Sequence, residues 1–326
     1  MCSLCSAGAQ VQQSGPRLSA LQRRVHMNYL AIDIGGTFIK YAVITENAEI
    51  ISKGKKPTDR DHIDVFLDTL EEIYRENEIS GPAGVAISMA GVLDVDRGFA
   101  YHGGGVWCVK NLEIVKILED RLKVPVTIEN DAKAAALAEV WMGNLSDVRD
   151  GIVIVLGTAI GGAVIIDRKV LRGKNLMAGE FSYISIGEAG KPAWPDTWGP
   201  AGGAPGLIRM TAAKKGLDPD TLDGVAVFDM VNGGDADARA ALREYTDLLA
   251  QQIMNLQVVI NPERFVIGGG ISCQPVLFEE LSKSVQVITD TFLGHVPAPD
   301  IMPCKFFNDS NLIGALYAHL TRRGIS

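Results

Sequence analysis

The feature that most constrains the fold of this chain is a unit that occurs twice: a β-type run, a glycine-rich turn containing a threonine, and a second β-type run. The first copy covers residues 29–45, with its turn at residues 35–37. The second copy covers residues 152–166, with its turn at residues 157–162. Repetition of one supersecondary unit indicates a duplicated architecture. We therefore expect an α/β chain of two similar domains that face each other across a cleft.

The first turn carries the groups that a metal-bound phosphate requires. Gly35 and Gly36 have no side chain, so the tip of this hairpin can approach a ligand closely. An acid at the end of the first run (Asp33), a hydroxyl (Thr37) and a lysine (Lys40) supply a metal-directed carboxylate and two phosphate partners. An ordinary hairpin turn explains the two glycines but leaves Asp33 unexplained.

Two later glycine clusters complete a predicted nucleotide site. The second turn contains Gly157, Thr158, Gly161 and Gly162. Because the two turns open the two halves of the chain, we expect them to hold a polyphosphate from both sides. A third turn, after the run at residues 265–267, consists of Gly268, Gly269 and Gly270. Backbone without side chains can lie close to the base and ribose of a nucleotide.

The stretch at residues 124–139 joins a β-type run to an alanine-rich segment of high helix propensity. Asn130 and Asp131 lie at the junction, which is where α/β sheets place their chemistry. Either residue can instead serve only as the helix N-cap. The two glycine turns on either side of this stretch favour a functional role for Asp131.

Three more segments are candidates for the wall of a substrate pocket. The run at residues 85–91 ends in small residues, including Gly91. Residues 101–107, with Gly104, are predicted to form a flexible loop that is either a plain connection or part of the pocket. Residues 174–206 are predicted to be irregular and to form a wall or lid. A single acid in such a segment, Glu180, is alternatively a solvated surface residue.

Apolar periodicity predicts helices at residues 62–77, around residues 242–256 and at residues 311–320. The last of these contains Gly314-Ala315, which is small enough for close packing against another element.

Composition limits the possible partners. A chain of 326 residues with 47% apolar residues has room for two ordinary domains. Its net charge of −8 argues against nucleic-acid and anionic-membrane partners, which need a concentrated basic field. The apolar run at residues 151–166 is too short and too rich in glycine to span a bilayer. Five scattered cysteines match neither a disulfide scaffold nor a zinc site, so we expect a reducing, cytoplasmic location.

Residues 1–26 differ from the rest of the chain because they contain arginines but no acid. A transit peptide is one interpretation. We favour a disordered extension or a mis-assigned start, with Met27 as the functional beginning.

The motifs occur in the order found in the ROK family of sugar kinases, which this chain resembles from Met27 to its C-terminus. The matching segments are Asp33-x-Gly35-Gly36-Thr37-x-x-Lys40, Glu129-Asn130-Asp131, Gly157-Thr158-x-x-Gly161-Gly162, Gly179-Glu180 and Gly268-Gly269-Gly270. The resemblance implies the duplicated actin/hexokinase-like ATPase fold. It implies an N-terminal domain at residues 27–128, completed by a C-terminal helix at residues 311–326, and a larger domain at residues 129–310.

The resemblance also implies an activity and a role for each motif. The enzyme would use ATP and Mg²⁺ to phosphorylate the 6-hydroxyl of a hexose, an N-acetylhexosamine such as N-acetylmannosamine, or a β-glucoside. Asp131 would be the general base, and Asp33 would be oriented toward the magnesium. The glycine turns would hold the phosphates and adenosine, and a homodimer is usual in the family. The residues around the sugar would be Gly91, Gly104, Asn130, Asp131, Glu180 and Tyr183.

Departures from the family pattern are informative. Most members have a histidine and a cysteine cluster that bind a structural zinc. Here Tyr183 stands at the histidine position, and residues 185–206 contain neither cysteine nor histidine. A tetrahedral zinc site cannot be built from these residues, so we expect the zinc-less branch of the family. Ala159 replaces a usual glycine, and residues 103–105 replace a segment that often touches the sugar, which leaves the sugar open.

Two other classes of function remain as alternatives. A non-catalytic sugar-binding sensor, or a ROK regulator that lacks a DNA-binding module, would share the fold. Regulators carry a helix-turn-helix module in front, whereas only 32 residues without helical periodicity precede Asp33. A chaperone or actin-like ATPase has no need of Glu180 or of a sugar wall.

Overall fold

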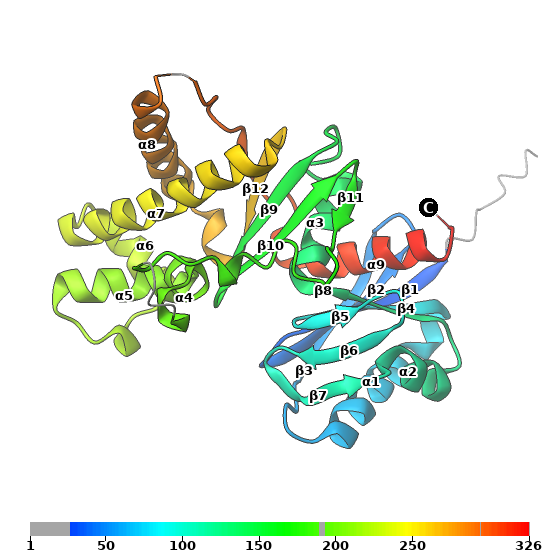
Figure 1. The fold of residues 1–326 in the computed structure, drawn as a ribbon. Helices are drawn as coiled ribbons and strands as arrows, with labels where there is room; N and C mark the ends of the chain where they lie inside the picture. The colour runs from blue at the N-terminus through cyan, green and yellow to red at the C-terminus, as the bar shows by residue number, and fades with distance from the viewer. Residues whose placement is uncertain (1–26, 189–192, 294, 326) are drawn as a thin grey trace, which may run out of the picture.

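The computed structural model describes residues 27–188, 193–293 and 295–325, in which two five-stranded sheets of the same strand order dominate (Figure 1). The first sheet has the order β3-β2-β1-β4-β8 and the second has the order β11-β10-β9-β12-β13. In each sheet the first two neighbouring pairs are antiparallel and the next two are parallel. The duplicated α/β architecture predicted from the two glycine turns is therefore confirmed.

The strands of the first sheet are β1 (Asn28–Ile34), β2 (Phe38–Thr45), β3 (Ile50–Pro57), β4 (Pro82–Met89) and β8 (Val126–Asn130). Those of the second are β9 (Gly151–Leu156), β10 (Ile160–Ile166), β11 (Lys169–Leu171), β12 (Arg264–Gly268) and β13 (Ile301–Pro303). A small third sheet contains β5 (Val92–Asp94), β6 (Phe99–Gly103) and β7 (Val106–Leu112). The expected domain boundary after residue 128 falls within β8, which reaches Asn130 in the first sheet.

Nine α-helices occur in the described ranges, and short 3₁₀ turns lie between them. The helices are α1 (Ile63–Asn77), α2 (Ile114–Leu122), α3 (Asp131–Met142), α4 (Trp198–Gly202), α5 (Ala204–Lys215), α6 (Gly224–Asn232), α7 (Ala236–Ile260), α8 (Pro275–Thr291) and α9 (Ser310–Arg322). No helix in the described part of the chain is long and apolar enough to cross a membrane. The predictions about residues 1–26 concern a segment outside the described residues.

Each sheet is covered by helices on both faces. In the second sheet, Ile152 and Ile154 of β9 belong to the cluster that includes α7 and α8, whereas Val153 belongs to the cluster that includes α3. Such alternation is the period of two along a strand. In the first sheet, Leu30 and Ile32 likewise face the cluster with α1 and α2. Strands buried on both faces read as continuous apolar runs, which is why the β1 and β9 sequences were easy to identify.

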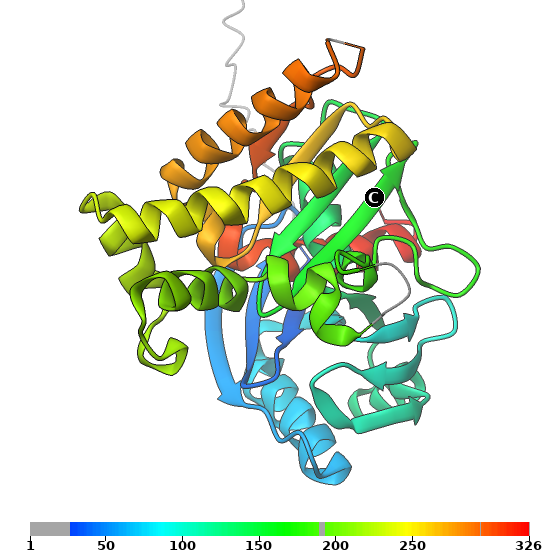
Figure 2. The same cartoon turned by 60° about the vertical axis from the view of Figure 1, so that its left-hand side comes forward.

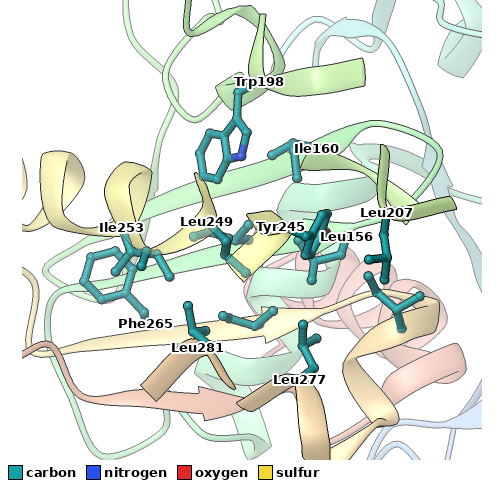
Figure 3. Packing of buried hydrophobic residues seen from close by; sticks show 14 of the residues in the cluster. Leu156, Ile160, Trp198, Leu207, Tyr245, Leu249, Ile253, Phe265, Leu277 and Leu281 are labelled. Carbon is teal, nitrogen blue, oxygen red and sulfur yellow. The ribbon is translucent and has the colours of Figure 1, made fainter. Parts of the chain in front are cut away.

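The core of the second domain gathers side chains that are distant in sequence. Figure 3 shows Leu156, Leu249, Phe265 and Leu281, from β9, α7, β12 and α8, in one buried cluster. Helix α7 supplies much of this cluster, and its N-cap Asp235 accepts a hydrogen bond from the backbone N–H of Ala238 at 2.9 Å. An aspartate at this position satisfies a backbone donor that the helix itself leaves free.

Two predicted irregular segments are more ordered than expected. Residues 101–107 were expected to form a flexible loop, but they lie in the β6–β7 hairpin with Gly104 and Gly105 at its turn. Gly104 has φ 58°, a left-handed conformation that glycine adopts without strain. Within residues 174–206, α4 and the start of α5 are helical. The prediction of loops was wrong because the glycines and prolines in these segments interrupt the residue patterns by which strands and helices are predicted.

Helices α3 and α9 lie side by side between the two sheets (Figures 1 and 2). They approach each other closely at Gly314, where a Cβ would lie 1.7 Å from the carbonyl oxygen of Ala134. The close packing predicted for Gly314-Ala315 is therefore confirmed. Leu312, Ile313 and Leu316 of α9 pack on the face of the first sheet that α1 and α2 leave open.

We predict that Gly314→Ala lowers the free energy of unfolding by about 1–3 kcal/mol, the usual cost of overpacking. The methyl group would meet backbone of α3, which cannot rotate away. Chemical denaturation measures the change. The control is Gly224→Ala at the start of α6, where a Cβ would meet only Ile271 Cγ2 at 3.7 Å. Equal stability of the two variants would contradict the proposed contact.

A buried histidine makes the same interface sensitive to acid. His319 of α9 is 1% exposed, its Nδ1 lies 3.0 Å from Thr127 Oγ1, and its ring packs edge-on against Tyr29. Burial lowers the pKa of His319 from 6.5 to about 4, and the charges of Arg323 and Arg322 add to this effect. The folded state therefore resists protonation of this ring between these two pH values.

We predict that His319→Gln loses less stability on acidification than the wild type. A histidine with a lowered folded-state pKa contributes stability above pH 6.5, and this is lost as the pH falls toward 4; at pH 5 the loss is about 2 kcal/mol. Urea unfolding at pH 7 and pH 5 measures the difference. His62→Gln, at an exposed histidine, is the control. An identical pH dependence in wild type and His319→Gln would refute the prediction.

Candidate functional site

Asp33 lies near the end of β1 and is buried. Its Oδ1 accepts hydrogen bonds from Ser88 Oγ at 3.2 Å and from Asn311 Nδ2 at 2.9 Å. Lys40 is its cross-strand neighbour on β2. Burial raises the pKa of the Asp33 carboxyl, while the Asn311 hydrogen bond and the charge of Lys40 oppose this rise. Three elements, β1, β4 and α9, therefore fix one carboxylate at the end of the sheet.

Asn130 and Asp131 have separate roles at the start of α3. Asn130 is the N-cap, since its Oδ1 accepts from the backbone N–H of Lys133 at 3.2 Å, and its Nδ2 donates to the carbonyl oxygen of Gly91 at 3.1 Å. Asp131 Oδ1 accepts from the backbone N–H of Ala132 at 2.8 Å. Because Asn130 caps the helix, the Asp131 carboxylate is available for another role.

The environment of Asp131 favours a proton-accepting carboxylate. Burial raises its pKa to about 6, and the charges of Asp33 and Glu180 add to the rise. The Ala132 N–H bond and the charge of Lys133 oppose it. A carboxyl with a pKa near the operating pH is a suitable general base.

Glu180 is held by a lysine that the sequence analysis did not select. Lys133 Nζ donates to Glu180 Oε1 at 2.6 Å, and the Lys133 side chain is buried. Glu180 precedes the short 3₁₀ turn η2 (Phe181–Tyr183), which follows β11 in the second domain. Thus α3 connects Asp131 and Glu180 through Lys133.

Glu129, the residue before the cap, is fully buried and paired with two arginines. Arg172 donates to both carboxylate oxygens, at 2.9 and 2.6 Å, and Arg322 of α9 donates to Oε2 at 3.3 Å. Bidentate pairs of this kind fix orientation. Since Arg172 follows β11, this pair ties the second domain to β8 beside Asp131.

The two predicted phosphate turns lie at corresponding places in the two sheets. Gly35, Gly36 and Thr37 connect β1 to β2, and a Cβ on Gly36 would meet nothing within 4 Å. The first turn is thus open to a ligand. The β6–β7 hairpin reaches it, because a Cβ on Gly105 would lie 4.0 Å from the Cα of Gly36.

The second turn is shorter than predicted. It contains only residues 157–159, because β10 begins at Ile160, so Gly157 and Thr158 are in the turn while Gly161 and Gly162 are in the strand. There these glycines allow close packing. A Cβ on Gly161 would lie 3.0 Å from Ala132 Cβ, and one on Gly162 would lie 2.2 Å from the Phe181 ring. They position the start of α3 and the Glu180 segment.

The third glycine cluster lies beside the second turn. Gly268 ends β12, Gly269 has φ 98°, and Gly270 begins the 3₁₀ turn η5 (Gly270–Cys273). A Cβ on Gly269 would lie 2.3 Å from the carbonyl oxygen of Leu156, the last residue of β9. The two clusters therefore lie together at the C-terminal ends of β9 and β12, and a Cβ on Gly270 would meet nothing within 4 Å.

Tyr183 is joined to Glu180 through its backbone, because its N–H donates to the Glu180 carbonyl oxygen at 3.2 Å. Its side chain is exposed, and its ring lies 5.6 Å from the ring of Trp194 in the short turn η3 (Trp194–Asp196). Gly91, by contrast, is brought to Asn130. The Gly104 hairpin turn packs next to Gly91, since a Cβ on Gly104 would lie 2.9 Å from Ala90 Cβ.

The sequence analysis missed four residues that hold the site together: Ser88, Lys133, Arg172 and Asn311. Lys133 had a signal, since it is the only charge between Asp131 and Glu139 in an alanine-rich helix. Asn311 had none, because its partner Asp33 is 278 residues earlier in the chain.

The arrangement of acids suits a magnesium ion bound with a nucleotide. Asp33 is buried with a raised pKa, and its charge acts on Asp131. A divalent cation would relieve this repulsion, and carboxylate oxygen is the ligand that Mg²⁺ prefers. Asp33 is therefore a suitable partner, directly or through water. Among the described residues no three His, Cys, Asp or Glu side chains form a metal cluster. The absence of structural zinc stays a prediction.

Duplicated sheets with glycine turns at their ends define the class of actin/hexokinase-like ATPases. Within this class, a model of the ROK family matches residues 29–322. The chain is 31% identical over 267 residues to a glucokinase of Halalkalibacterium halodurans. This alignment covers 75% of this chain and 80% of the relative. It is 28% identical over 298 residues to a beta-glucoside kinase of Listeria monocytogenes, and this alignment covers 90% of this chain and 98% of the relative.

Comparison with a solved structure also indicates the ROK family. The fold matches that of a ROK family protein from Streptococcus pneumoniae in complex with sucrose, with a TM-score of 0.82 and 27% identity. This match covers 91% of this chain and 99% of the other. The chain therefore belongs to the ROK family.

We predict that kcat/KM for the phosphoryl acceptor falls about tenfold per pH unit below a pH of about 6. This value is the raised pKa of Asp131, and the protonated carboxyl cannot accept a proton. Initial rates between pH 4.5 and 8 measure it, with prior incubation at each pH as the control for stability. A rate that stays level down to pH 5, as an aspartate with the ordinary pKa of about 4 would give, would contradict the assigned environment.

Proposed function

We propose that this chain transfers the γ-phosphoryl group of ATP to the 6-hydroxyl of a hexose, an N-acetylhexosamine or a β-glucoside, with Asp131 as the general base. The observation that carries this proposal is the position of Asp131 at the start of α3. Its half-buried carboxyl is not needed as a cap and has a pKa raised to about 6. The free carboxyl and its raised pKa are observations on this chain that support the proposal independently of the family resemblance.

The chain is an ATP-dependent sugar phosphotransferase. The family match covers nearly all of the described residues, and the named relatives are sugar kinases such as glucokinase and beta-glucoside kinase. The identity of the phosphorylated sugar is part of our proposal. The names of the relatives support glucose, β-glucosides and N-acetylated hexosamines as candidates.

Each group in the site has a part in the proposed reaction. Asp131 accepts the proton of the sugar hydroxyl as its oxygen attacks the γ-phosphorus, and the γ-phosphoryl group passes to that oxygen while ADP leaves. Asn130 and Glu180 hold neighbouring hydroxyls. The turns at Gly35 and Gly157 lie close to the phosphates and exclude water. Phosphoryl transfer depends mainly on such positioning and on charge neutralisation, and bound Mg²⁺ supplies much of the latter beside Asp33.

Other parts of the proposal concern assembly and location. We expect a homodimer in the cytoplasm that binds no nucleic acid or membrane. The acidic net charge of −8 supports the last point. Gly268, Gly269 and Gly270 are the proposed adenosine wall, and Lys40 and Thr158 are proposed phosphate partners.

We predict that Asp131→Asn lowers kcat by about 10²-fold or more and leaves ATP binding unchanged, because only the proton acceptor is removed. Release of ADP from Mg²⁺-ATP is measured with glucose, mannose, N-acetylmannosamine, N-acetylglucosamine, fructose, cellobiose and gentiobiose. NMR of the product identifies the phosphorylated hydroxyl.

Asp64→Asn, an exposed aspartate in the first turn of α1, is the matched control and keeps full activity. If Asp131→Asn turns over at the wild-type rate, Asp131 is not the base. If no sugar releases ADP although sugar binds, the chain is a sensor rather than a kinase.

A further inference from the structure

The least expected buried group in the site is the lysine of α3. Lys133 is 3% exposed, and alanines surround it in the sequence. Moving an ammonium group out of water costs several kcal/mol unless good partners compensate. An alanine or leucine would satisfy the packing at lower cost, so the retention of this charge calls for a role beyond folding.

The only hydrogen-bond acceptor of Lys133 Nζ among the described residues is Glu180 Oε1, at 2.6 Å. Glu180 Oε2 accepts no hydrogen bond from the described part of the chain, and the Glu180 side chain remains 25% exposed. The lysine thus fixes one oxygen of this carboxylate and leaves the other available to a ligand. A carboxylate held in this way loses little rotamer entropy when a ligand binds.

The neighbouring cation is already engaged elsewhere. Arg172 lines the same small cavity as Lys133, Asn130 and Gly91, but its guanidinium binds both oxygens of Glu129. Lys133 is therefore the cation that neutralises Glu180, whose charge would otherwise add fully to the charges of Asp131 and Asp33. Because Lys133 lies two residues after Asp131, the single helix α3 positions both Asp131 and the partner of Glu180.

We propose that Lys133 is a positioning residue for the sugar: its ammonium group fixes Glu180 so that Oε2 is pre-oriented to accept a hydrogen bond from a sugar hydroxyl. This inference rests on the proposed kinase function. It assigns Glu180 and Lys133 to one unit that acts on sugar affinity. Within the described residues no side-chain hydrogen bond or ion pair joins Lys133 or Glu180 to the turns at Gly35 and Gly157, so we expect the affinity for ATP to be independent of this pair.

The test is a double-mutant cycle with Lys133→Met, Glu180→Gln and the double variant. Loss of a hydrogen bond to a charged group costs about 1.5–3 kcal/mol, which corresponds to about a 10- to 100-fold loss of kcat/KM for the sugar. Lys133→Met raises KM for the sugar by about 10-fold or more, while KM for Mg²⁺-ATP changes less than about twofold. Because both residues act as one unit, the double variant is no worse than Glu180→Gln alone.

Lys133→Arg keeps the cation and restores part of the sugar affinity lost in Lys133→Met. Thermal unfolding of each variant separates loss of fold from loss of affinity, and Lys133→Arg carries the test if Lys133→Met does not fold. The control is Lys215→Met, which removes a lysine paired with Asp235 at 2.5 Å between α5 and α7 and leaves both KM values unchanged.

Three results would overturn the inference: losses that multiply in the double variant, equal increases in both KM values, or an unchanged sugar KM in Lys133→Met. Failure of the proposed function has a different result. In that case the wild-type protein phosphorylates no sugar, or Asp131→Asn is fully active, whatever the Lys133 variants do.

Discussion

The contact between α3 and α9 is the interaction on which the rest of the structure depends. Gly314 allows the backbone of α9 to meet the carbonyl oxygen of Ala134, so two helices fit between the two sheets. Both helices begin at the site, α3 at Asp131 and α9 next to Asn311. Close packing at the glycine therefore sets the relation between Asp131 and Asp33, which Asn311 binds.

Charge balance explains the side chains that surround this contact. The charges of Asp33 and Glu180 both act on Asp131, and a fourth acid, Glu129, is fully buried. Each acid has a different set of compensating groups. Glu129 has two arginines, Glu180 has Lys133, and Asp33 has amide and hydroxyl donors. Asp131 accepts a hydrogen bond from the N–H of Ala132 and is acted on by the charge of Lys133, but burial still keeps its pKa raised.

Much of the fold follows from local patterns. The runs of β1 and β9 and the alanine-rich α3 were predictable because each has a strong period or propensity of its own. The predicted turn at Gly161 and Gly162 was wrong because glycine also occurs in strands where another element packs closely, here Ala132 and Phe181. The pairs Asp33–Asn311 and Glu129–Arg172 could not be predicted, since they join segments whose separation in sequence hides their proximity.

The position of α9 also affects the order in which the chain can fold during synthesis. Tyr29, Ala31, Ala42 and Ile44 on one face of the first sheet pack against residues of α9, which is synthesised after every strand of the two large sheets. The first sheet is therefore made early but keeps an apolar face uncovered until α9 has been synthesised. In the meantime the second domain, whose strands lie between residues 151 and 303, can complete its own sheet. The first sheet can consequently be covered only after all strands of the second sheet have been synthesised, whereas vectorial folding usually begins with the N-terminal part.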